Sequence, residues 1–293
     1  MSLRQYPKIS IITPSYNQAD YLRHTITSIL NQNYPNLEYI IIDGGSTDGS
    51  LEIIKEYASQ LSYWESEGDK GMYHALHKGF ERSTGEIMAW LNADDILQPN
   101  ALWLLAEIFS QSEQIEWIQG YPSIIDENNR TVRLIYTQLN KSFFYSKKYI
   151  ATGTYIQQES TFWRRSLWEK AGGYISQDYH YAGDFELWIR FFQYAPLHFV
   201  YAPLGAFRMR NAQQASQIYY QDYVAETVTI LAKYPLSPQE QRLLRNSLFY
   251  EKIANKCNFW VQKLFGKHIW ADNSFVENKI YFNREAQEFR YRN

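Results

Sequence analysis

The chain has 293 residues, of which 45% are hydrophobic, and its 29 Lys and Arg against 31 Asp and Glu give a formal net charge of −2. This hydrophobic fraction is enough for a buried core, and the absence of net positive charge argues against a nucleic-acid binder. Cys257 is the only cysteine, which excludes an internal disulfide or a cysteine-rich zinc site and fits a reducing, cytoplasmic setting. We expect neither a secretory leader nor a transmembrane helix, because no apolar run is long enough.

Strand and helix patterns alternate through the first 120 residues. Short apolar runs predict strands over 9–12, 39–42, 62–64 and 87–91. Apolar positions at helical spacing predict helices over 19–32, 49–60, 71–82 and 99–109. Strands that alternate with helices of this length are typical of crossover units in a parallel sheet, so the fold class is α/β.

The pattern changes after residue 115. Stretches 115–125 and 131–137 flank a turn-rich segment and predict an antiparallel hairpin attached to the parallel sheet. Helices over 163–170 and 183–194 and a short strand near 197–201 follow, and beyond 213 the patterning is helical only. We therefore expect an α/β domain over 1–212 and a C-terminal helical extension over 213–293.

Polar loops follow each of the four predicted strands. Ligands of open α/β sheets bind beyond the carboxyl ends of the strands, so these loops are candidates for a site. A dinucleotide fingerprint would need Gly-x-Gly-x-x-Gly after the first strand, where the sequence has Thr-Pro-Ser-Tyr-Asn, and a Walker loop is also missing.

Asp43 ends the second predicted strand beside Gly44 and Gly45, which would allow a ligand to approach closely. A carboxylate in this position can accept a hydrogen bond from the N–H of a nucleobase. The alternative is that Asp43 only ends the strand while one of residues 46–48 caps the next helix.

The run Asn92-Ala93-Asp94-Asp95 follows the fourth predicted strand. Adjacent carboxylates repel each other unless they are solvated, paired or bound to a cation. A hard divalent cation, Mg²⁺ or Mn²⁺, would use one or two carboxylates and complete its shell with water and substrate phosphates. The alternative is that one of the two aspartates caps the helix that begins near Pro99.

Four motifs together resemble those of family 2 glycosyltransferases: Pro14-Ser15-Tyr16-Asn17, Asp43-Gly44-Gly45-Ser46-Thr47-Asp48, Asp69-Lys70-Gly71 and Leu91-Asn92-Ala93-Asp94-Asp95. The resemblance covers residues 7–110 and resumes over 153–210. It implies a GT-A-type fold with a mixed, mainly parallel sheet flanked by helices, a nucleotide-sugar donor and an inverting mechanism.

The resemblance also implies roles for single residues around the donor. Those expected to bind the nucleotide or its metal are Thr13, Pro14 and Tyr16 in the pocket wall, Asp43 at the base, Asp69 with Lys70 closing over base or diphosphate, Asn92 at the ribose and Asp94 as the metal ligand. Asn92 stands where the family more often has Asp.

The second half of the chain supplies a catalytic base by the same resemblance. Asp184 matches the acidic position before Leu-Trp that takes the proton of the acceptor hydroxyl, and Gly183 replaces a second acidic residue. Its alternative role is a helix cap. Contacts with acceptor or diphosphate are expected from Asp95, from Trp163, which could instead be a core residue, and from Arg210, which could instead be a solvated surface arginine.

We therefore expect a metal-dependent, inverting, cytoplasmic glycosyltransferase that uses a UDP-sugar and a glycan or lipid-linked saccharide acceptor. The alternative is a non-catalytic nucleotide-sugar or glycan-binding protein on the same fold. The aromatic tail from 213 could contact the inner face of the membrane or form an oligomer interface, and its mixed charges leave both open.

Overall fold

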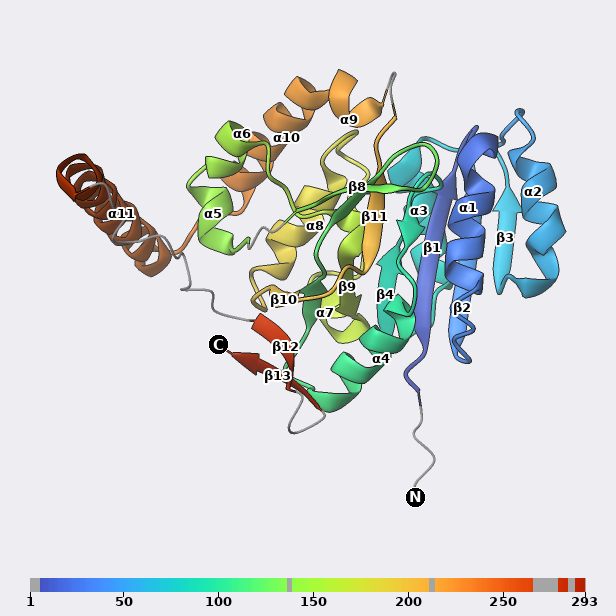
Figure 1. Cartoon of the computed structure of the whole chain (residues 1–293). Helices are drawn as coiled ribbons and strands as arrows, with labels where there is room; N and C mark the ends of the chain where they lie inside the picture. The colour runs from blue at the N-terminus through green and yellow to red at the C-terminus, as the bar shows by residue number, and fades with distance from the viewer. Residues whose placement is uncertain (1–5, 136–138, 211–213, 266–278, 284–287, 293) are drawn as a thin grey trace.

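The computed structural model describes residues 6–135, 139–210, 214–265, 279–283 and 288–292. Within them, a nine-stranded sheet of order β13-β12-β10-β6-β9-β4-β1-β2-β3 forms the centre and helices flank it (Figure 1). A smaller sheet of order β5-β11-β7-β8 lies beside it. The predicted α/β class is confirmed.

The first half of the chain forms the parallel part of the main sheet. Its strands are β1 (Ile9–Ser15), β2 (Leu37–Asp43), β3 (Tyr63–Ser66) and β4 (Ile87–Trp90). The connecting helices are α1 (Ala19–Leu30), α2 (Ser50–Tyr57) with a 3₁₀ turn (Ala58–Gln60), and α3 (Met72–Arg82), and α4 (Ala101–Gln111) follows. Every residue of β1 and β4 is buried, as expected for strands covered on both faces.

The second half enters the sheet with an antiparallel strand that the sequence pattern did not predict. β9 (Thr161–Arg164) lies between β4 and β6 (Trp117–Gln119) and pairs antiparallel with both. The helix expected over 163–170 therefore begins only at α7 (Arg165–Lys170). All four residues of β9 are buried, so burial and strand pairing decide their conformation against the local helical pattern.

The predicted hairpin exists but belongs to the smaller sheet. It consists of β7 (Ser123–Ile125) and β8 (Thr131–Leu134), and β5 (Ile96–Leu97) and β11 (Gly205–Arg208) complete this sheet. The single strand expected over 115–125 is thus two strands in different sheets. Pro122 lies between them and cannot donate a ladder hydrogen bond, which suits a break at this point.

Between β8 and residue 265, helices make up most of the described chain. Short helices α5 (Lys141–Tyr145) and α6 (Lys148–Thr152) and the 3₁₀ turn η2 (Gln158–Ser160) precede β9, and α8 (Gly183–Phe191) and β10 (His198–Val200) follow α7. Beyond them come α9 (Ala215–Ile218), α10 (Tyr220–Lys233), which packs against α8, and α11 (Pro238–Phe265).

Two strands at the C-terminus correct the expectation of helix alone beyond residue 213. β12 (Lys279–Asn283) pairs parallel with β10, and β13 (Glu288–Arg292) pairs antiparallel with β12. Ile280 is fully buried against the sheet while Tyr281 and Phe282 are 43% and 44% exposed. The run Ile280-Tyr281-Phe282 is short and does not alternate between apolar and polar residues, so it is too weak a signal to mark an edge strand from sequence.

Much of the aromatic content lies in the core. Trp90 and Trp188 stack with ring centroids 5.6 Å apart and planes 5° apart, and Trp117 and Trp163 lie 5.7 and 5.6 Å from Trp188. All four side chains are buried. This tryptophan cluster joins β4, β6 and β9 to α8, so it fixes the helix that carries Asp184.

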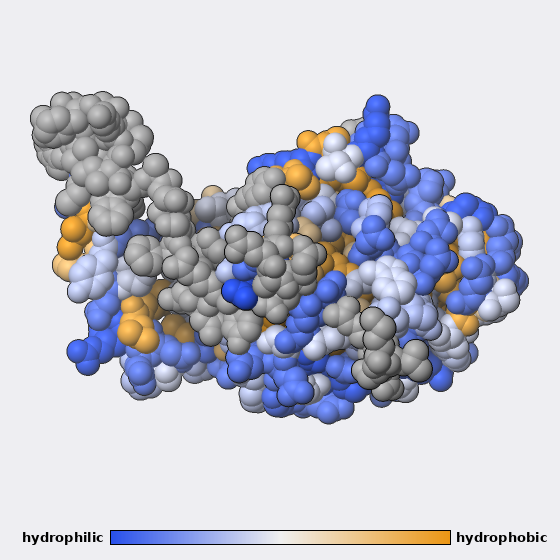
Figure 2. Space-filling model, turned by 60° about the horizontal axis from the view of Figure 1, so that its bottom comes forward, coloured by the Kyte–Doolittle hydropathy of each residue, from blue (hydrophilic) through white to orange (hydrophobic). Residues whose placement is uncertain are grey.

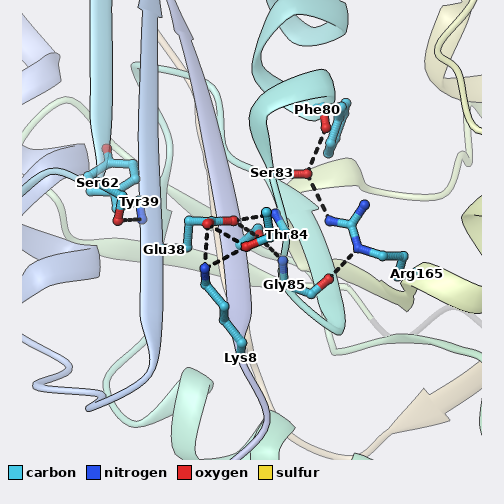
Figure 3. Close-up of polar contacts among 10 residues, drawn as sticks. Lys8, Glu38, Tyr39, Ser62, Phe80, Ser83, Thr84, Gly85 and Arg165 are labelled. Carbon is cyan, nitrogen blue, oxygen red and sulfur yellow. Dashed lines mark hydrogen bonds and ion pairs between the residues drawn. The ribbon is translucent and has the colours of Figure 1, made fainter.

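A network of hydrogen bonds joins the amino ends of β1 and β2 to the segment before β4 (Figure 3). Glu38 accepts hydrogen bonds from Lys8 Nζ at 2.6 Å and from Ser10 Oγ at 2.5 Å, and also from the N–H of Thr84 at 2.6 Å. Burial disfavours the charged carboxylate, but these donors prevail and hold the pKa of Glu38 at about 2.

The molecular surface is predominantly hydrophilic on the face seen in Figure 2, with hydrophobic residues in separate patches. In the part of the chain that the structure describes, no helix combines the length and the hydropathy needed to cross a bilayer.

Candidate active site

The loops that follow the parallel strands meet at one edge of the main sheet. The last residues of β1, β2 and β3 lie side by side, with Ser15 opposite Asp43 and Asp43 opposite Ser66. The fourth loop follows β4, which pairs with β1. The structure therefore brings the four sequence motifs together, as expected from strand order.

The first two loops are joined by hydrogen bonds. The N–H of Asn17 donates to Ser46 Oγ at 2.8 Å, and the N–H of Thr47 donates to Asn17 Oδ1 at 2.9 Å. Asp48 accepts from the N–H of Ala19 at 2.9 Å at the start of α1. The polar residues of these two motifs thus hold the loops in a fixed arrangement.

Asp43 is completely buried beneath this pair of loops. Its Oδ2 accepts from the N–H groups of Gly45 and Ser46 at 3.2 and 2.9 Å and from Ser66 Oγ at 2.7 Å, while Oδ1 accepts from Ser46 Oγ at 2.5 Å. Oδ2 accepts three hydrogen bonds and Oδ1 only one, so a nucleobase N–H could bind at Oδ1 or take the place of a serine hydroxyl.

The three residues expected in the pocket wall differ in exposure. Thr13 and Pro14 are buried within β1, and the Thr13 hydroxyl lies 3.1 Å from the hydroxyl of Tyr39. Tyr16 is 62% exposed. The side chain open to a ligand is therefore Tyr16, while Thr13 and Pro14 support the strand beneath it.

Asp69 and Gly44 approach each other closely. A Cβ on Gly44 would lie 2.9 Å from Asp69 Oδ2, so only glycine leaves room for this carboxylate. Asp69 Oδ1 accepts from the N–H of Gly71 at 2.7 Å, and Lys70 is exposed beside it. The expected pair of Asp69 and Lys70 therefore lies next to the Asp43 loop.

Asp95 connects the loop after β4 to the smaller sheet. It is 1% exposed, and its Oδ1 accepts from the N–H of Arg208 at 2.9 Å. Burial, together with the neighbouring charge of Asp94, raises the pKa of Asp95 well above its usual range. Asp95 is thus enclosed by protein, which does not favour the expected contact with acceptor or diphosphate.

Asp94 forms an ion pair with Arg210, whose side chain is 25% exposed. Arg210 Nε is buried without a hydrogen-bond partner among the described residues, so one donor of the guanidinium remains available. Arg208 lies beneath, fully buried, and donates from Nε to the backbone oxygen of Asp94 at 2.6 Å. Both guanidinium groups lie over the ring of Tyr21, at 4.9 and 5.2 Å.

The oxygen atoms of this loop are suited to a cation that arrives with a phosphate. Among the residues that the structure describes, no three His, Cys, Asp or Glu side chains form a metal cage. Asn92 Oδ1 is buried with no partner there, and the carboxylate of Asp94 is held by a single arginine. A single carboxylate is enough for Mg²⁺ when water and substrate phosphates complete its shell, so Asp94 could hold the cation while the amide oxygen of Asn92 stays open to another donor.

Asp184 lies in the first turn of α8 and is partly exposed. Its N–H donates to the hydroxyl of Tyr73 at 3.3 Å, and that hydroxyl donates to the carbonyl of Tyr181 at 2.9 Å. A Cβ on Gly183 would lie 2.8 Å from the ring of Tyr73. Gly183 is therefore required by packing, which gives this departure from the family motif a structural cause.

Although Asp184 keeps some contact with solvent, its partial burial disfavours the charged carboxylate and raises its pKa to about 7. The loop before α8 is held by Glu226 of α10, which accepts from the N–H groups of His180, Tyr181 and Ala182 at 2.9, 3.0 and 2.7 Å. The charge of Glu226 adds to the shift at Asp184. A carboxylate with a pKa near neutrality is well matched to accept a proton.

Two other carboxylates, those of Glu186 and Glu159, are buried. Glu186 is fully buried and pairs with Arg190 at 2.9 Å, so it belongs to the core. Glu159, on η2, is 3% exposed and its Oε1 has no hydrogen-bond partner in the described part of the chain. Burial raises the pKa of Glu159 to about 8, and the charges of Asp184 and Asp94 add to the shift.

Gln158, the neighbour of Glu159 on η2, donates to the carbonyl oxygen of Trp90 at 2.9 Å, so Glu159 lies near the end of β4 and the loop that carries Asp94. Asp184 is joined to the loop after β3 through Tyr73, which lies in the first turn of α3. Glu159 is not singled out by the sequence, and its burial is the feature that reveals it. Trp163, by contrast, is fully buried in the tryptophan cluster, so the core interpretation holds and stacking on a sugar does not.

The chain is similar in sequence to known glycosyltransferases. The family model described as glycosyl transferase family 2 matches residues 10–171. An uncharacterized glycosyltransferase of Rickettsia typhi is 28% identical over 250 residues, which cover 82% of this chain and 76% of that protein. An uncharacterized glycosyltransferase of Nostoc is 35% identical over 137 residues, or 45% of this chain and 41% of that protein, so only part of some relatives is represented here.

Solved structures share the fold. Residues 1–349 of S. aureus TarS in complex with UDP-GlcNAc align with a TM-score of 0.59 at 15% identity, covering 81% of this chain and 70% of that one. A mannosyltransferase from Pyrobaculum calidifontis in complex with GDP-Man and Mn²⁺ aligns with a TM-score of 0.57 at 17% identity, covering 80% and 67%. These structures match the mixed α/β sheet and its flanking helices.

Proposed function

The chain belongs to glycosyl transferase family 2 and is a glycosyltransferase, and from this premise we propose that it moves a sugar from a nucleoside diphosphate donor to a hydroxyl group of a glycan or lipid-linked saccharide. The observation that supports the proposal most is the contact of Asp184 with Tyr73, which joins a carboxylate with a pKa of about 7 to the helix that follows the Asp69-Lys70-Gly71 loop. The cytoplasmic setting expected from the sequence belongs to the same proposal.

The donor is proposed to lie over the joined loops after β1 and β2. Tyr16 would cover the base, and Asp43 would accept its N–H at Oδ1 or in exchange for a serine hydroxyl. Asp69 and Lys70 would close over the base or the diphosphate, and the free amide oxygen of Asn92 would accept from the ribose. We propose a UDP-sugar, in keeping with the UDP-GlcNAc bound by TarS.

Asp94 is proposed to hold Mg²⁺ or Mn²⁺, with support from the Mn²⁺ in the related mannosyltransferase structure. When bound, the cation would act as a Lewis acid and neutralise the charge of the diphosphate. Arg210 pairs with Oδ2 of Asp94, so a cation on this carboxylate would lie beside Arg210, whose guanidinium could then bind a phosphate oxygen.

Transfer is proposed to occur in a single displacement with inversion. Asp184 accepts the proton of the acceptor hydroxyl as the oxygen attacks the anomeric carbon, and the bond to the nucleoside diphosphate breaks. The loops hold both reactants aligned, so no covalent enzyme intermediate is needed. Tyr73 keeps the first turn of α8 in place for this step.

The test is calorimetric titration of UDP and GDP, each with and without Mn²⁺, followed by assay of sugar transfer. Metal-dependent binding of one nucleotide and turnover of its sugar would support the proposal. If neither UDP nor GDP bound, with or without Mn²⁺, the proposal would be contradicted. Asp184→Asn separates the steps, because binding should survive and transfer should not.

A further inference from the structure

Helix α11 exposes its side chains far more than the other long helices. It projects from the body beside α5 (Figure 1), and among its described side chains, in 238–254 and at 256, none is buried. Leu243, Phe249 and Tyr250 are 61%, 60% and 68% exposed, and Ile253 is 43% exposed. Helices gain most of their stability from packing an apolar face. We therefore expect these side chains to pack against a partner outside the described chain.

Two ion pairs orient the helix. Glu240 pairs with Lys141 of α5, with Nζ to Oε1 at 2.7 Å, and Glu251 pairs with Lys148 of α6. Residues 11 apart are three helical turns apart and lie on the same side. The acidic side of α11 therefore faces the body, and its charges are neutralised there.

The remaining charges of this part of α11 are positive. Arg245, Lys252 and Lys256 are exposed and lie within roughly 40° of one another around the helix, about 130° away from Glu240 and Glu251 at 100° per residue. Arg242 lies beside this basic stripe. The acids that could neutralise these residues along the helix are engaged by Lys141 and Lys148.

The exposed apolar residues border the basic stripe. Phe249 and Ile253 follow it around the helix, and Tyr250 and Leu243 come next, by the same helical spacing. A helix with basic residues beside aromatic and aliphatic ones is typical of the boundary between lipid headgroups and acyl chains.

We propose that α11 docks on a bilayer surface that contains anionic lipids, with Arg242, Arg245, Lys252 and Lys256 at the headgroups and Leu243, Phe249, Tyr250 and Ile253 at the acyl boundary. A second copy of α11 is disfavoured as the occupant, because two like-charged stripes would repel each other. A nucleic acid would leave the aliphatic residues without a partner. This inference stands independently of the proposed donor and acceptor.

The test is flotation of the full chain with vesicles of phosphatidylcholine, alone or mixed with phosphatidylglycerol. We expect binding to the mixed vesicles that falls with added salt, and weak binding to the neutral ones. R245E/K252E should lower the partition coefficient by at least about thirtyfold, since each basic residue near an anionic surface contributes roughly fivefold. K55E/R133E carries the same charge change on exposed residues of the body and should bind as the unchanged chain does.

F249S/I253S tests the apolar part and should also weaken binding, without a change in nucleotide affinity. Equal binding to neutral and anionic vesicles, or the same loss in K55E/R133E, would overturn the proposal. Absence of vesicle binding together with a dimer that R245E/K252E or F249S/I253S dissociates would assign the surface to a second copy instead. Nucleotide titration of each variant keeps this result separate from the test of donor binding.

Discussion

Asp184 is the side chain on which the proposed chemistry depends. Replacing it by asparagine keeps the size and the contact with Tyr73 but removes the proton acceptor, so kcat should fall by about 10²- to 10⁴-fold, the usual contribution of a general base. Nucleotide affinity measured by calorimetry should stay the same. Asp178→Asn, an exposed acid in the loop before α8, is the matched control. Wild-type turnover by Asp184→Asn would show that another group takes the proton.

The raised pKa of Asp184 predicts a pH dependence of transfer. The base works when it is deprotonated, so kcat/KM should rise with pH to a plateau with a midpoint of about 7, and not near the ordinary value of 3.8. Glu159→Gln distinguishes the two candidates for this titration, because it should leave the midpoint in place. If kcat/KM of Glu159→Gln no longer changed with pH, the rise near pH 7 would be due to Glu159 and not to Asp184.

The same shift has a consequence for stability. The folded state holds the proton of Asp184 more tightly than the unfolded chain does, so this residue's contribution to the free energy of unfolding decreases as pH rises from about 4 to about 7. The Asp184→Asn variant should lose this part of the pH dependence.

Asp94 is predicted to make nucleotide binding depend on metal. Asp94→Asn should raise the Kd of UDP in the presence of Mn²⁺ by at least about tenfold, the scale on which even outer-shell partners affect metal affinity. The Kd without metal should change much less, and Glu113→Gln, an exposed acid elsewhere, should change neither. An equal loss with and without Mn²⁺ would show that Asp94 acts through Arg210 rather than through a cation.

Residue types at strand ends were predictable from the sequence, but their contacts were not. Asp43 and Asp94 stand where strand order places them, yet Ser66, which donates to Asp43, comes from β3, and Arg210, which pairs with Asp94, comes from the segment after β11. Glu159 carries no local signal, since its unpartnered oxygen exists only because the second half of the chain encloses it.

The close approach of the loops after β2 and β3 requires glycine at position 44. A methyl group there would press on Asp69, so Gly44→Ala should displace this carboxylate and weaken nucleotide binding by about tenfold, as overpacking by one carbon costs about 1–3 kcal/mol. Gly68→Ala is the matched control in the neighbouring loop, because a Cβ there meets nothing within 4 Å. Calorimetry of both variants checks the prediction, and similar affinities would show that Asp69 does not bind the nucleotide.

At the scale of elements, the sequence predicts the parallel half better than the rest. β2 and β4 contain continuous apolar runs and β1 is mostly apolar, and helices of regular period lie between these strands, so local pattern and fold agree. β9 and β12 owe their conformation to neighbours that are distant in sequence, β4 and β6 for one and β10 for the other. Patterns read within a window cannot contain that information.

At the scale of the whole molecule, the C-terminal strands β12 and β13 form one edge of the main sheet. Ile280 is fully buried against β10, so Ile280→Ala should lower the free energy of unfolding by about 2–5 kcal/mol in urea titrations. Tyr281→Ala, at a 43% exposed neighbour, should have a much smaller effect. Equal stability of the two variants would mean that the hairpin adds little to the fold.

The tryptophan cluster should also give a circular dichroism signal that depends on the packing of α8 against the sheet. Indole rings stacked as closely as Trp90 and Trp188 couple their electronic transitions, which produces paired bands of opposite sign in circular dichroism. One partner of each pair with Trp188 lies on the sheet and the other on the helix that carries Asp184. These bands should therefore persist while α8 is seated and vanish when it separates from the sheet, so the geometry of the base can be followed without any label.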